Sequence, residues 1–367
     1  MPALNPPPAL TVNLGERGYP VYVGPRVLEG LGALVEAHTP DATGCVVVTS
    51  ESVNRLYGGP TVESLQRLKP KLVTVPDGEG AKTWDQAGAL IGGLVEAGMD
   101  RKGVVVALGG GTVGDLAGFA ASIYLRGVRV VQVPTTLLGQ ADSCIGGKTA
   151  VNLSEAKNLV GSFHQPSLVA ADTGLLGSLP RREVASGLAE VVKHGVIADG
   201  ALLRLVEERS RELLGGDEEA LAEAVTRSLA VKASFVEGDE RETRGLRVCL
   251  NYGHTVGHAV ERLSGGEVRH GEAVAVGMDV AASLAVNRGI LPEQALSRQR
   301  HVLSGIGLNT RVPGMDAREL LRVARRDKKA QGGQIRFILP TGIGSRPVLE
   351  EVPEAELIGA LEENMIE

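Results

Sequence analysis

Two histidines four positions apart, His254 and His258, lie in the stretch NYGHTVGHA at 251–259. Residues at this spacing share one face of a helix, so the two imidazoles would point the same way. The spacing also occurs in the H-E-x-x-H motif of zinc proteases, but Thr255 stands where that motif has its glutamate. The stretch predicts two side chains that either bind one metal together or have different roles.

A third histidine and a glutamate extend this set of candidate metal ligands. His270 lies in VRHGEAVAVGM, just before a predicted helix, and Glu190 lies in ASGLAEVVKHG with Lys193 one helical turn later. Apolar residues flank Glu190, and a buried carboxylate needs a cation, which a metal or Lys193 would supply. A solvated surface pair of Glu190 and Lys193 is the simpler alternative. A catalytic zinc site takes three protein ligands and keeps one position open.

Two glycine-rich segments are candidates for binding anions. GVVVALGGGTVGD (103–115) has G-x-G-x-x-G spacing directly after a predicted strand, where backbone N–H groups can approach a phosphate. The acidic residue expected about 20 positions later in a dinucleotide-binding fingerprint is missing, so a tight strand-to-helix turn is an equal alternative. DSCIGGKT (142–149) resembles a Walker A loop, but Asp142 replaces its first glycine and argues against an ATPase.

Several basic residues lie in glycine-rich or apolar surroundings. Each one alone is most simply a solvated side chain, but a pocket that gathers many of them would bind a small, multiply charged anion such as a phosphorylated carboxylate. These residues are Arg126, Lys148, Lys157, Lys193, Lys232, Arg247 and the pair Lys328 and Lys329.

The composition sets limits on the class of protein. The 367 residues suffice for two domains, and 43% hydrophobic residues are typical of a globular chain. A net charge of −6 without a basic run argues against a nucleic-acid surface. Three scattered cysteines without a C-x-x-C pair fit a reducing cytoplasm. We expect no signal peptide in MPALNPPPAL and no membrane-spanning segment, and hence no membrane partner.

The positioning elements fall into two halves. Up to about residue 175, Val-rich runs at 44–50, 71–75, 103–108 and 128–134 alternate with helical stretches such as 83–97, which predicts a parallel sheet covered on both faces. After residue 180, helical periodicity dominates at 181–236, 252–263, 271–287 and 293–304, and only 336–340 reads as a strand. We expect an α/β nucleotide-binding domain at 1–178 and a mainly helical domain at 179–367.

The motifs, in this order, resemble those of the 3-dehydroquinate synthase family of sugar-phosphate cyclases. The resemblance runs from PDGEGAK (76–82) to RDKKAQGGQIRFILP (326–340) and includes GGGTVGDLAGFAA, VPTTLLGQADSCIGGKTAVN, KNLVGSFHQP, GLAEVVKHG, GLRVCLNYGHTVGHA and RHGEAVAVGM. It implies conversion of 3-deoxy-arabino-heptulosonate 7-phosphate, a phosphorylated keto acid, to 3-dehydroquinate and phosphate in the shikimate pathway. The implied steps are transient oxidation with NAD, phosphate elimination, re-reduction, ring opening and aldol closure.

The resemblance also assigns cofactors and roles to residues. It implies NAD in the α/β domain, a divalent metal, usually zinc with cobalt as an alternative, in the helical domain, and a homodimer. The metal ligands would be Glu190, His254 and His270. NAD contacts would come from Glu79, Lys82, Gly110, Gly111, Thr112, Asp115, Thr135, Thr136, Asp142, Ser143, Lys148 and Lys157. Substrate contacts would come from Arg126, Asp142, Lys148, Lys157, Asn158, Lys193, Lys232, Arg247, Asn251, His258 and one of Lys328 and Lys329. The catalytic group would be Lys148, Asn158, Lys193, Arg247, Asn251 and His258, with His258 in proton transfer.

Three positions depart from the family's pattern, and three rival functions remain. Ser50 stands where relatives commonly have a ribose-binding aspartate, and Leu175 and Ser178 replace a phenylalanine and a threonine. One rival is a cyclase for another sugar phosphate, of the 2-deoxy-scyllo-inosose or valiolone type. Another is a metal-dependent dehydrogenase of the glycerol dehydrogenase type, which would release NADH. A nucleotide-binding regulatory module would leave the candidate ligands unexplained.

Overall fold

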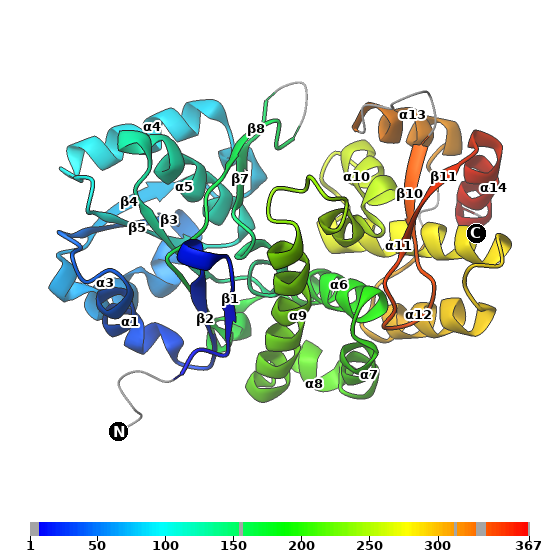
Figure 1. The fold of residues 1–367 in the computed structure, drawn as a ribbon, viewed down its shortest axis with the longest axis horizontal. Coiled ribbons are helices and arrows are strands. Elements are labelled where there is room, and N and C mark those ends of the chain that lie inside the picture. The colour runs from blue at the N-terminus through cyan, green and yellow to red at the C-terminus, as the bar shows by residue number, and fades with distance from the viewer. Residues whose placement is uncertain (1–6, 154–156, 312–313, 328–334, 366–367) are drawn as a thin grey trace. The chain divides into compact units, whose positions relative to one another are not determined.

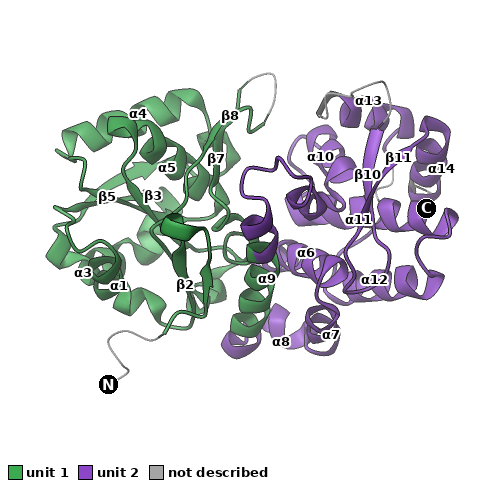
Figure 2. Cartoon of the chain, in the orientation of Figure 1, with its two compact units in different colours: residues 1–179, 221–233 green, residues 180–220, 234–367 purple. Residues whose placement is uncertain are grey.

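The computed structural model describes residues 7–153, 157–311, 314–327 and 335–365 (Figure 1). The chain forms two compact units (Figure 2). Unit 1 comprises residues 1–179 and 221–233, and unit 2 comprises residues 180–220 and 234–367. Helix α9 (Glu218–Gly238) therefore contributes residues to both units. Lys328 and Lys329 lie outside the described residues.

Unit 1 is built on a seven-stranded sheet with the strand order β1-β2-β9-β6-β5-β3-β4. Its pairs are parallel except for β1 and β2. The strands are β1 (Leu10–Val12), β2 (Tyr19–Gly24), β3 (Cys45–Ser50), β4 (Lys71–Val75), β5 (Val104–Gly109), β6 (Arg129–Pro134) and β9 (Leu168–Asp172). The four Val-rich runs form β3 to β6, which confirms the parallel sheet.

The sheet is buried on both faces, which explains why its strands are continuously apolar. Val46 and Val48 of β3 enter the core under α4 (Trp84–Glu96) and α5 (Gly111–Ile123). Val47, which points the other way, enters the core that includes α1 (Leu31–His38). The shorter elements of unit 1 are α2 (Glu51–Val53), α3 (Gly59–Ser64) and the hairpin of β7 (Lys148–Val151) and β8 (Val160–Phe163).

Unit 2 is mainly helical, as the sequence predicts. Its helices are α6 (Arg181–Ile197), α7 (Gly200–Glu208), α8 (Ser210–Gly215), α10 (His254–Leu263), α11 (His270–Asn287), α12 (Glu293–Gly305), α13 (Ala317–Asp327) and α14 (Glu354–Met365). The predicted strand near 336–340 is β10 (Ile335–Leu339), and it pairs with β11 (Val348–Val352), which the sequence pattern did not indicate. Within the described residues, no helix combines the length and apolar character that crossing a bilayer requires.

The helical stretch predicted at 181–236 is divided into four helices. The first break separates α6 from α7. The Asp199 side chain accepts hydrogen bonds from the N–H groups of Ala201 and Leu202 and so caps the N-terminus of α7. Gly216 adopts φ = 83° after α8, a conformation that favours glycine. Asp217 then caps α9 through the N–H of Ala220. The helical character was predicted correctly, and the capping residues set the breaks.

Candidate functional site

Three side chains of unit 2 form a cluster with the composition of a metal site. Glu190 comes from the middle of α6, and His254 and His270 are the first residues of α10 and α11. The Nε2 atoms of His254 and His270 lie 3.5 Å and 3.3 Å from Glu190 Oε1. One ligand atom from each residue lies within 4.8 Å of the other two. Two imidazole nitrogens and a carboxylate oxygen form a typical catalytic zinc ligand set.

The charged and titratable groups of the cluster are buried and lie close together. The side chain of Glu190 is 1% exposed, and Lys193, one turn later on α6, forms an ion pair with it. Burial lowers the pKa of His254 to about 3, although Glu190 opposes this effect. Burial would also lower the pKa of His270, but the carboxylates of Glu190 and Glu261 more than offset it and raise the pKa to about 10.

Glycines allow the helices that carry Glu190, His254 and His270 to approach closely. A Cβ atom added at Gly277 of α11 would lie 1.8 Å from the carbonyl oxygen of Gly253, just before α10. A Cβ added at Gly271 would lie 1.9 Å from the carbonyl oxygen of Ser186 on α6. Gly253 also needs φ = 79° to begin α10. The glycines beside the histidines thus bring α6, α10 and α11 together at the cluster.

The Nδ1 side of both His254 and His270 also has a hydrogen-bond partner. Nδ1 of His254 lies 3.1 Å from the carbonyl oxygen of Tyr252, and Nδ1 of His270 lies 3.2 Å from Glu261 Oε2. The hydroxyl of Tyr252 donates to the carbonyl of Met278 at 3.1 Å and lies 2.7 Å from Gln299 Oε1. Both imidazoles can thereby carry their proton on Nδ1 and present Nε2 toward Glu190.

His258 lies next to this cluster but is not part of it. Its ring centroid is 5.3 Å from that of His254 and 6.3 Å from that of His270. Within the described residues, His254 and His270 belong to a group of atoms close enough to share an ion, and no such group includes His258. The helical spacing that suggested a metal-binding pair therefore brings the two rings together without making them equivalent.

The loop that leads to Arg247 in unit 2 folds around the carboxylate of Asp239. Asp239 Oδ1 accepts from the N–H groups of Thr243 and Arg244 at 2.8 Å and 3.0 Å, and Oδ2 accepts from those of Leu246 and Arg247 at 3.0 Å and 3.3 Å. Burial would raise the pKa of Asp239, but these four bonds outweigh it and keep the pKa below its ordinary value. Arg247 is 2% exposed, and Nη1 donates to the carbonyl of Glu240 at 2.7 Å. Asn251 ends the 3₁₀ turn that Arg247 begins.

In unit 1, the predicted glycine loop lies at the carboxyl end of β5 and opens α5. A Cβ added at Gly110 would lie 3.1 Å from Thr136 Cγ2, and one at Gly111 would lie 3.0 Å from Ser143 Oγ. The N–H of Thr135, after β6, donates to the carbonyl of Gly109 at 3.0 Å. The glycine loop therefore lies against the Thr135-Thr136 pair and Ser143. It leads into the N-terminus of α5, and a helix N-terminus favours bound anions.

Polar side chains of the predicted cofactor set form two hydrogen-bonded groups beside this loop. Glu79 accepts from Thr112 Oγ1 at 3.0 Å and from Asn152 Nδ2 at 2.8 Å. Lys82, 4% exposed, forms an ion pair with Asp115 and donates to Asn158 Oδ1. Burial raises the pKa of Asp115, and the Lys82 ammonium works against this rise. The loop helix and the 79–82 segment are thus linked by charge.

The remaining basic residues differ in their surroundings. Lys232 on α9 lies 3.0 Å from Asp142 Oδ2 and donates to the Asp142 carbonyl at 2.7 Å. Lys148 starts β7 and is exposed. It follows Gly146 and Gly147, whose φ values of 90° and 64° favour glycine. The structure places Arg126 and Lys157 of this set at exposed positions, and the predicted substrate residue Asn158, next to Lys157, is exposed as well.

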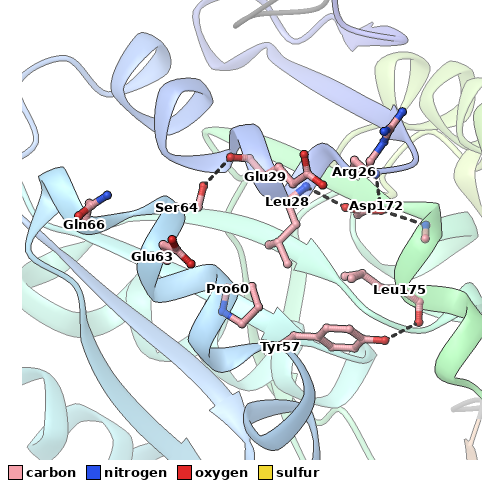
Figure 3. A pocket seen from close by; sticks show the side chains of 11 residues that line it. Arg26, Leu28, Glu29, Tyr57, Pro60, Glu63, Ser64, Gln66, Asp172 and Leu175 are labelled. Atoms are coloured by element: carbon pink, nitrogen blue, oxygen red, sulfur yellow. Dashed lines mark hydrogen bonds between the residues drawn. The ribbon is translucent and has the colours of Figure 1, made fainter. Parts of the chain in front are cut away.

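A hollow of 720 Å³ opens beside segments that follow the carboxyl ends of β2, β3 and β9 (Figure 3). Tyr57 and Leu175 line it, and the Tyr57 hydroxyl donates to the Leu175 carbonyl at 3.0 Å. Asp172 also lines it, but its carboxylate is occupied by the N–H groups of Arg26, Leu28 and Gly174. Ligands of open α/β sheets bind at this edge. One departure from the family pattern, Leu175, therefore belongs to a ligand-sized hollow.

Ser50 ends β3 at the same edge, next to a carboxylate from the neighbouring strand. Asp77 follows β4 and accepts from the N–H and the hydroxyl of Ser52, with the hydroxyl at 2.5 Å. Hydrogen bonds from Ser50 and Ser52 lower the pKa of Asp77. The edge therefore keeps a negative charge close to Ser50.

Two residues that shape the site were not predicted from the sequence. Glu261 lies seven positions after His254, on the helix face that His254 and His258 share, so its helical spacing was a usable signal. Asp239 has no such signal, because four backbone N–H groups of a loop converge on it only after folding.

Comparison with known proteins gives consistent results over most of the chain. Residues 72–186 match the model of the 3-dehydroquinate synthase N-terminal family, and residues 187–330 match the 3-dehydroquinate synthase C-terminal family. A protein of Symbiobacterium thermophilum named 3-dehydroquinate synthase is 49% identical over 349 residues, which cover 94% of this chain and 97% of that protein.

Solved structures of sugar-phosphate cyclases are similar in fold. A 2-deoxy-scyllo-inosose synthase in complex with carbaglucose-6-phosphate, NAD+ and Co2+ has a TM-score of 0.88 at 28% identity, covering 97% of this chain and 99% of its own. The 2-epi-5-epi-valiolone synthase of Streptomyces hygroscopicus subsp. jinggangensis with NAD+ and Zn2+ bound has a TM-score of 0.86 at 30% identity, covering 96% and 98%. Because both family models and a near-full-length relative at 49% identity agree, the chain belongs to the 3-dehydroquinate synthase family.

Proposed function

We propose that this chain converts 3-deoxy-D-arabino-heptulosonate 7-phosphate to 3-dehydroquinate and phosphate, a carbon–oxygen lyase reaction of the shikimate pathway. The observation that carries the proposal is the cluster of Glu190, His254 and His270 in a chain that is 49% identical to a 3-dehydroquinate synthase. The rival cyclases are supported less, because their solved structures are only 28–30% identical.

The proposed metal site is formed by Glu190, His254 and His270, with zinc as the expected ion and cobalt as an alternative. The donor set fits, since three ligand atoms lie within 4.8 Å of one another and both imidazoles present Nε2. A divalent ion here would lower the pKa of a substrate hydroxyl and fix its orientation. Lys193, paired with Glu190, would hold an anionic group of the substrate beside the site.

The proposed NAD site lies at the carboxyl edge of the sheet in unit 1. NAD would supply the hydride acceptor for the transient oxidation. The N-terminus of α5 and the neighbouring loop N–H groups would bind its phosphates. The residues proposed to contact it are Glu79, Lys82, Gly110, Gly111, Thr112, Asp115, Thr135, Thr136, Asp142, Ser143, Lys148 and Lys157.

The proposed substrate residues suit a substrate with a phosphate and a carboxylate. Their cations would bind both anionic groups, and His258 would move a proton next to the metal site. They are Arg126, Asp142, Lys148, Lys157, Asn158, Lys193, Lys232, Arg247, Asn251 and His258, together with Lys328 or Lys329 outside the described residues.

Three broader features belong to this proposal. Residues 1–178 would be the NAD-binding domain and residues 179–367 the metal- and substrate-binding domain. The chain would act in the cytoplasm, in keeping with three buried free cysteines, Cys45, Cys144 and Cys249. It would be a homodimer, the commonest symmetric assembly, which sedimentation equilibrium would measure.

One assay tests the reaction and separates the rivals. The purified chain receives the heptulosonate phosphate, a divalent metal and NAD+ in an amount far below that of the substrate. We expect phosphate release and dehydroquinate formation over many turnovers, without accumulation of NADH. Stoichiometric NADH would instead indicate a dehydrogenase. Phosphate release from glucose 6-phosphate, and not from the heptulosonate phosphate, would indicate another cyclase.

A further inference from the structure

The two proposed ligand histidines are held differently on the side away from Glu190. His254 faces a backbone carbonyl, that of Tyr252, whereas His270 faces a carboxylate, Glu261 Oε2, at 3.2 Å. The Glu261 side chain is 20% exposed and that of His270 is 27% exposed, so their contact is partly shielded from water. A carboxylate in this position does more than a surface ion pair, because the other nitrogen of the same ring faces Glu190 at 3.3 Å.

The position of His270 in the chain explains why its ring needs an outside partner. His270 is the first residue of α11, and the residue before it, Arg269, has an extended backbone. No preceding helical turn therefore restrains the ring. Glu261 sits in α10, on the face that also carries His254 and His258, and the glycine contact between α10 and α11 brings it within reach of Nδ1.

We propose that Glu261 is a positioning residue of the metal site, which accepts the N–H of His270 Nδ1 and thereby aims Nε2 at the ion. The inference rests on the proposed ligand set of Glu190, His254 and His270. A carboxylate on the far nitrogen fixes the tautomer that leaves Nε2 available, orients the ring and makes Nε2 a stronger donor.

The charges around the cluster favour a second carboxylate. Glu190 already faces Lys193, so one negative charge would be shared between an ammonium and a divalent ion. Glu261 adds a negative charge on the outer side of His270. Its carboxylate lies within hydrogen-bond distance of the His270 ring, whose other nitrogen would bind the ion. Loss of this charge should weaken metal binding even if the fold and the three ligands stay in place.

The test compares Glu261→Ala and Glu261→Gln with the matched control Glu267→Gln in the full chain. Glu267 is exposed and lies between α10 and α11, so its variant removes the same charge without touching His270. Zn2+ and Co2+ affinities are measured by competition with a chromogenic chelator, and the visible spectrum of bound Co2+ reports the ligand geometry. Circular dichroism and thermal unfolding check that each variant is folded.

We expect Glu261→Ala to bind metal about 10–100-fold more weakly and to change the Co2+ spectrum. Glu261→Gln, which keeps an acceptor oxygen, should show a smaller loss, and Glu267→Gln should match the wild type. If Glu261→Ala keeps the wild-type affinity and spectrum, or if Glu267→Gln loses as much affinity, the positioning role is wrong. If the wild type binds no metal, or His254→Ala binds it as tightly, the proposed metal site itself fails, and the role of Glu261 fails with it.

Discussion

At the scale of single residues, the site separates two histidines that the chain places one helical turn apart. His254 presents Nε2 to Glu190 at 3.5 Å, while the atoms close enough to share an ion do not include His258. Because the rings are in edge contact, with centroids 5.3 Å apart, a proton carrier at His258 would lie beside a hydroxyl bound at the metal. The pair is suited to dividing metal binding and proton transfer.

This division predicts that one alanine variant loses Zn2+ affinity and that another loses reaction rate. His254→Ala should weaken Zn2+ binding by more than about 100-fold, since even a ligand's outer partner is worth about 10–100-fold. His258→Ala should keep the Zn2+ affinity and lower the rate of phosphate release by about 10²–10⁴-fold, the usual contribution of a general acid or base. Chelator competition and a phosphate-release assay measure the two effects. Loss of metal from His258→Ala would show that the two histidines share the ion.

At the scale of elements, the site depends on helices that touch through backbone. Gly277 packs on the carbonyl of Gly253, and a methyl group there would meet backbone that cannot rotate away. We expect Gly277→Ala to destabilise unit 2 by about 1–3 kcal/mol through overpacking, and to weaken metal binding, since Gly253 directly precedes His254.

The matched control for this prediction is Gly359→Ala on α14. A Cβ there would meet nothing within 4 Å, so alanine should be neutral or stabilise the helix by up to about 1 kcal/mol. Urea unfolding and metal titration measure both variants. Equal stability of the two variants would contradict the close contact between α10 and α11.

The loop that carries Arg247 makes a second prediction at this scale. Asp239→Asn should destabilise unit 2 by about 1–2 kcal/mol at pH 7, because a neutral amide replaces a carboxylate that accepts four N–H bonds. The pKa of Asp239 in the folded chain lies below the ordinary 3.8, so its stabilisation is full above that value and is lost as the pH falls through the folded pKa.

The difference between wild type and Asp239→Asn should therefore be constant from about pH 7 to pH 5 and shrink at more acidic pH. Thermal unfolding across this range measures it. A difference that grows as the pH falls would mean that the carboxylate is not stabilised in its charged form.

Sequence patterns predicted the elements better than the contacts between them. The Val-rich strands β3 to β6 and the helices α10, α11 and α12 follow from local periodicity, and the structure has them close to the predicted residues. Strand β11, with its two glutamates, lacks an apolar pattern and is recognisable only from its pairing with β10. Glu261 and Asp239 act through contacts between segments, which residue spacing alone does not specify.

At the scale of the whole molecule, the two compact units carry separate proposed ligands. Unit 1 has its own cores on the two faces of its sheet, with the glycine loop at the carboxyl edge. Unit 2 holds Glu190, His254 and His270 on three helices, of which α11 packs against both α6 and α10. Because a ligand stabilises the structure that binds it, zinc and NAD should slow hydrogen exchange in different parts of the chain.

Hydrogen exchange measured by mass spectrometry tests this separation. Zn2+ at 100 times its dissociation constant should stabilise its binding structure by about 2.7 kcal/mol and slow exchange in α6, α10 and α11 by up to about 100-fold. NAD+ alone should slow exchange at 109–123, the glycine loop and α5. In His254→Ala the zinc effect should vanish while the NAD+ effect remains. Zinc protection confined to the glycine loop, or NAD+ protection lost in His254→Ala, would contradict the assignment of one ligand to each unit.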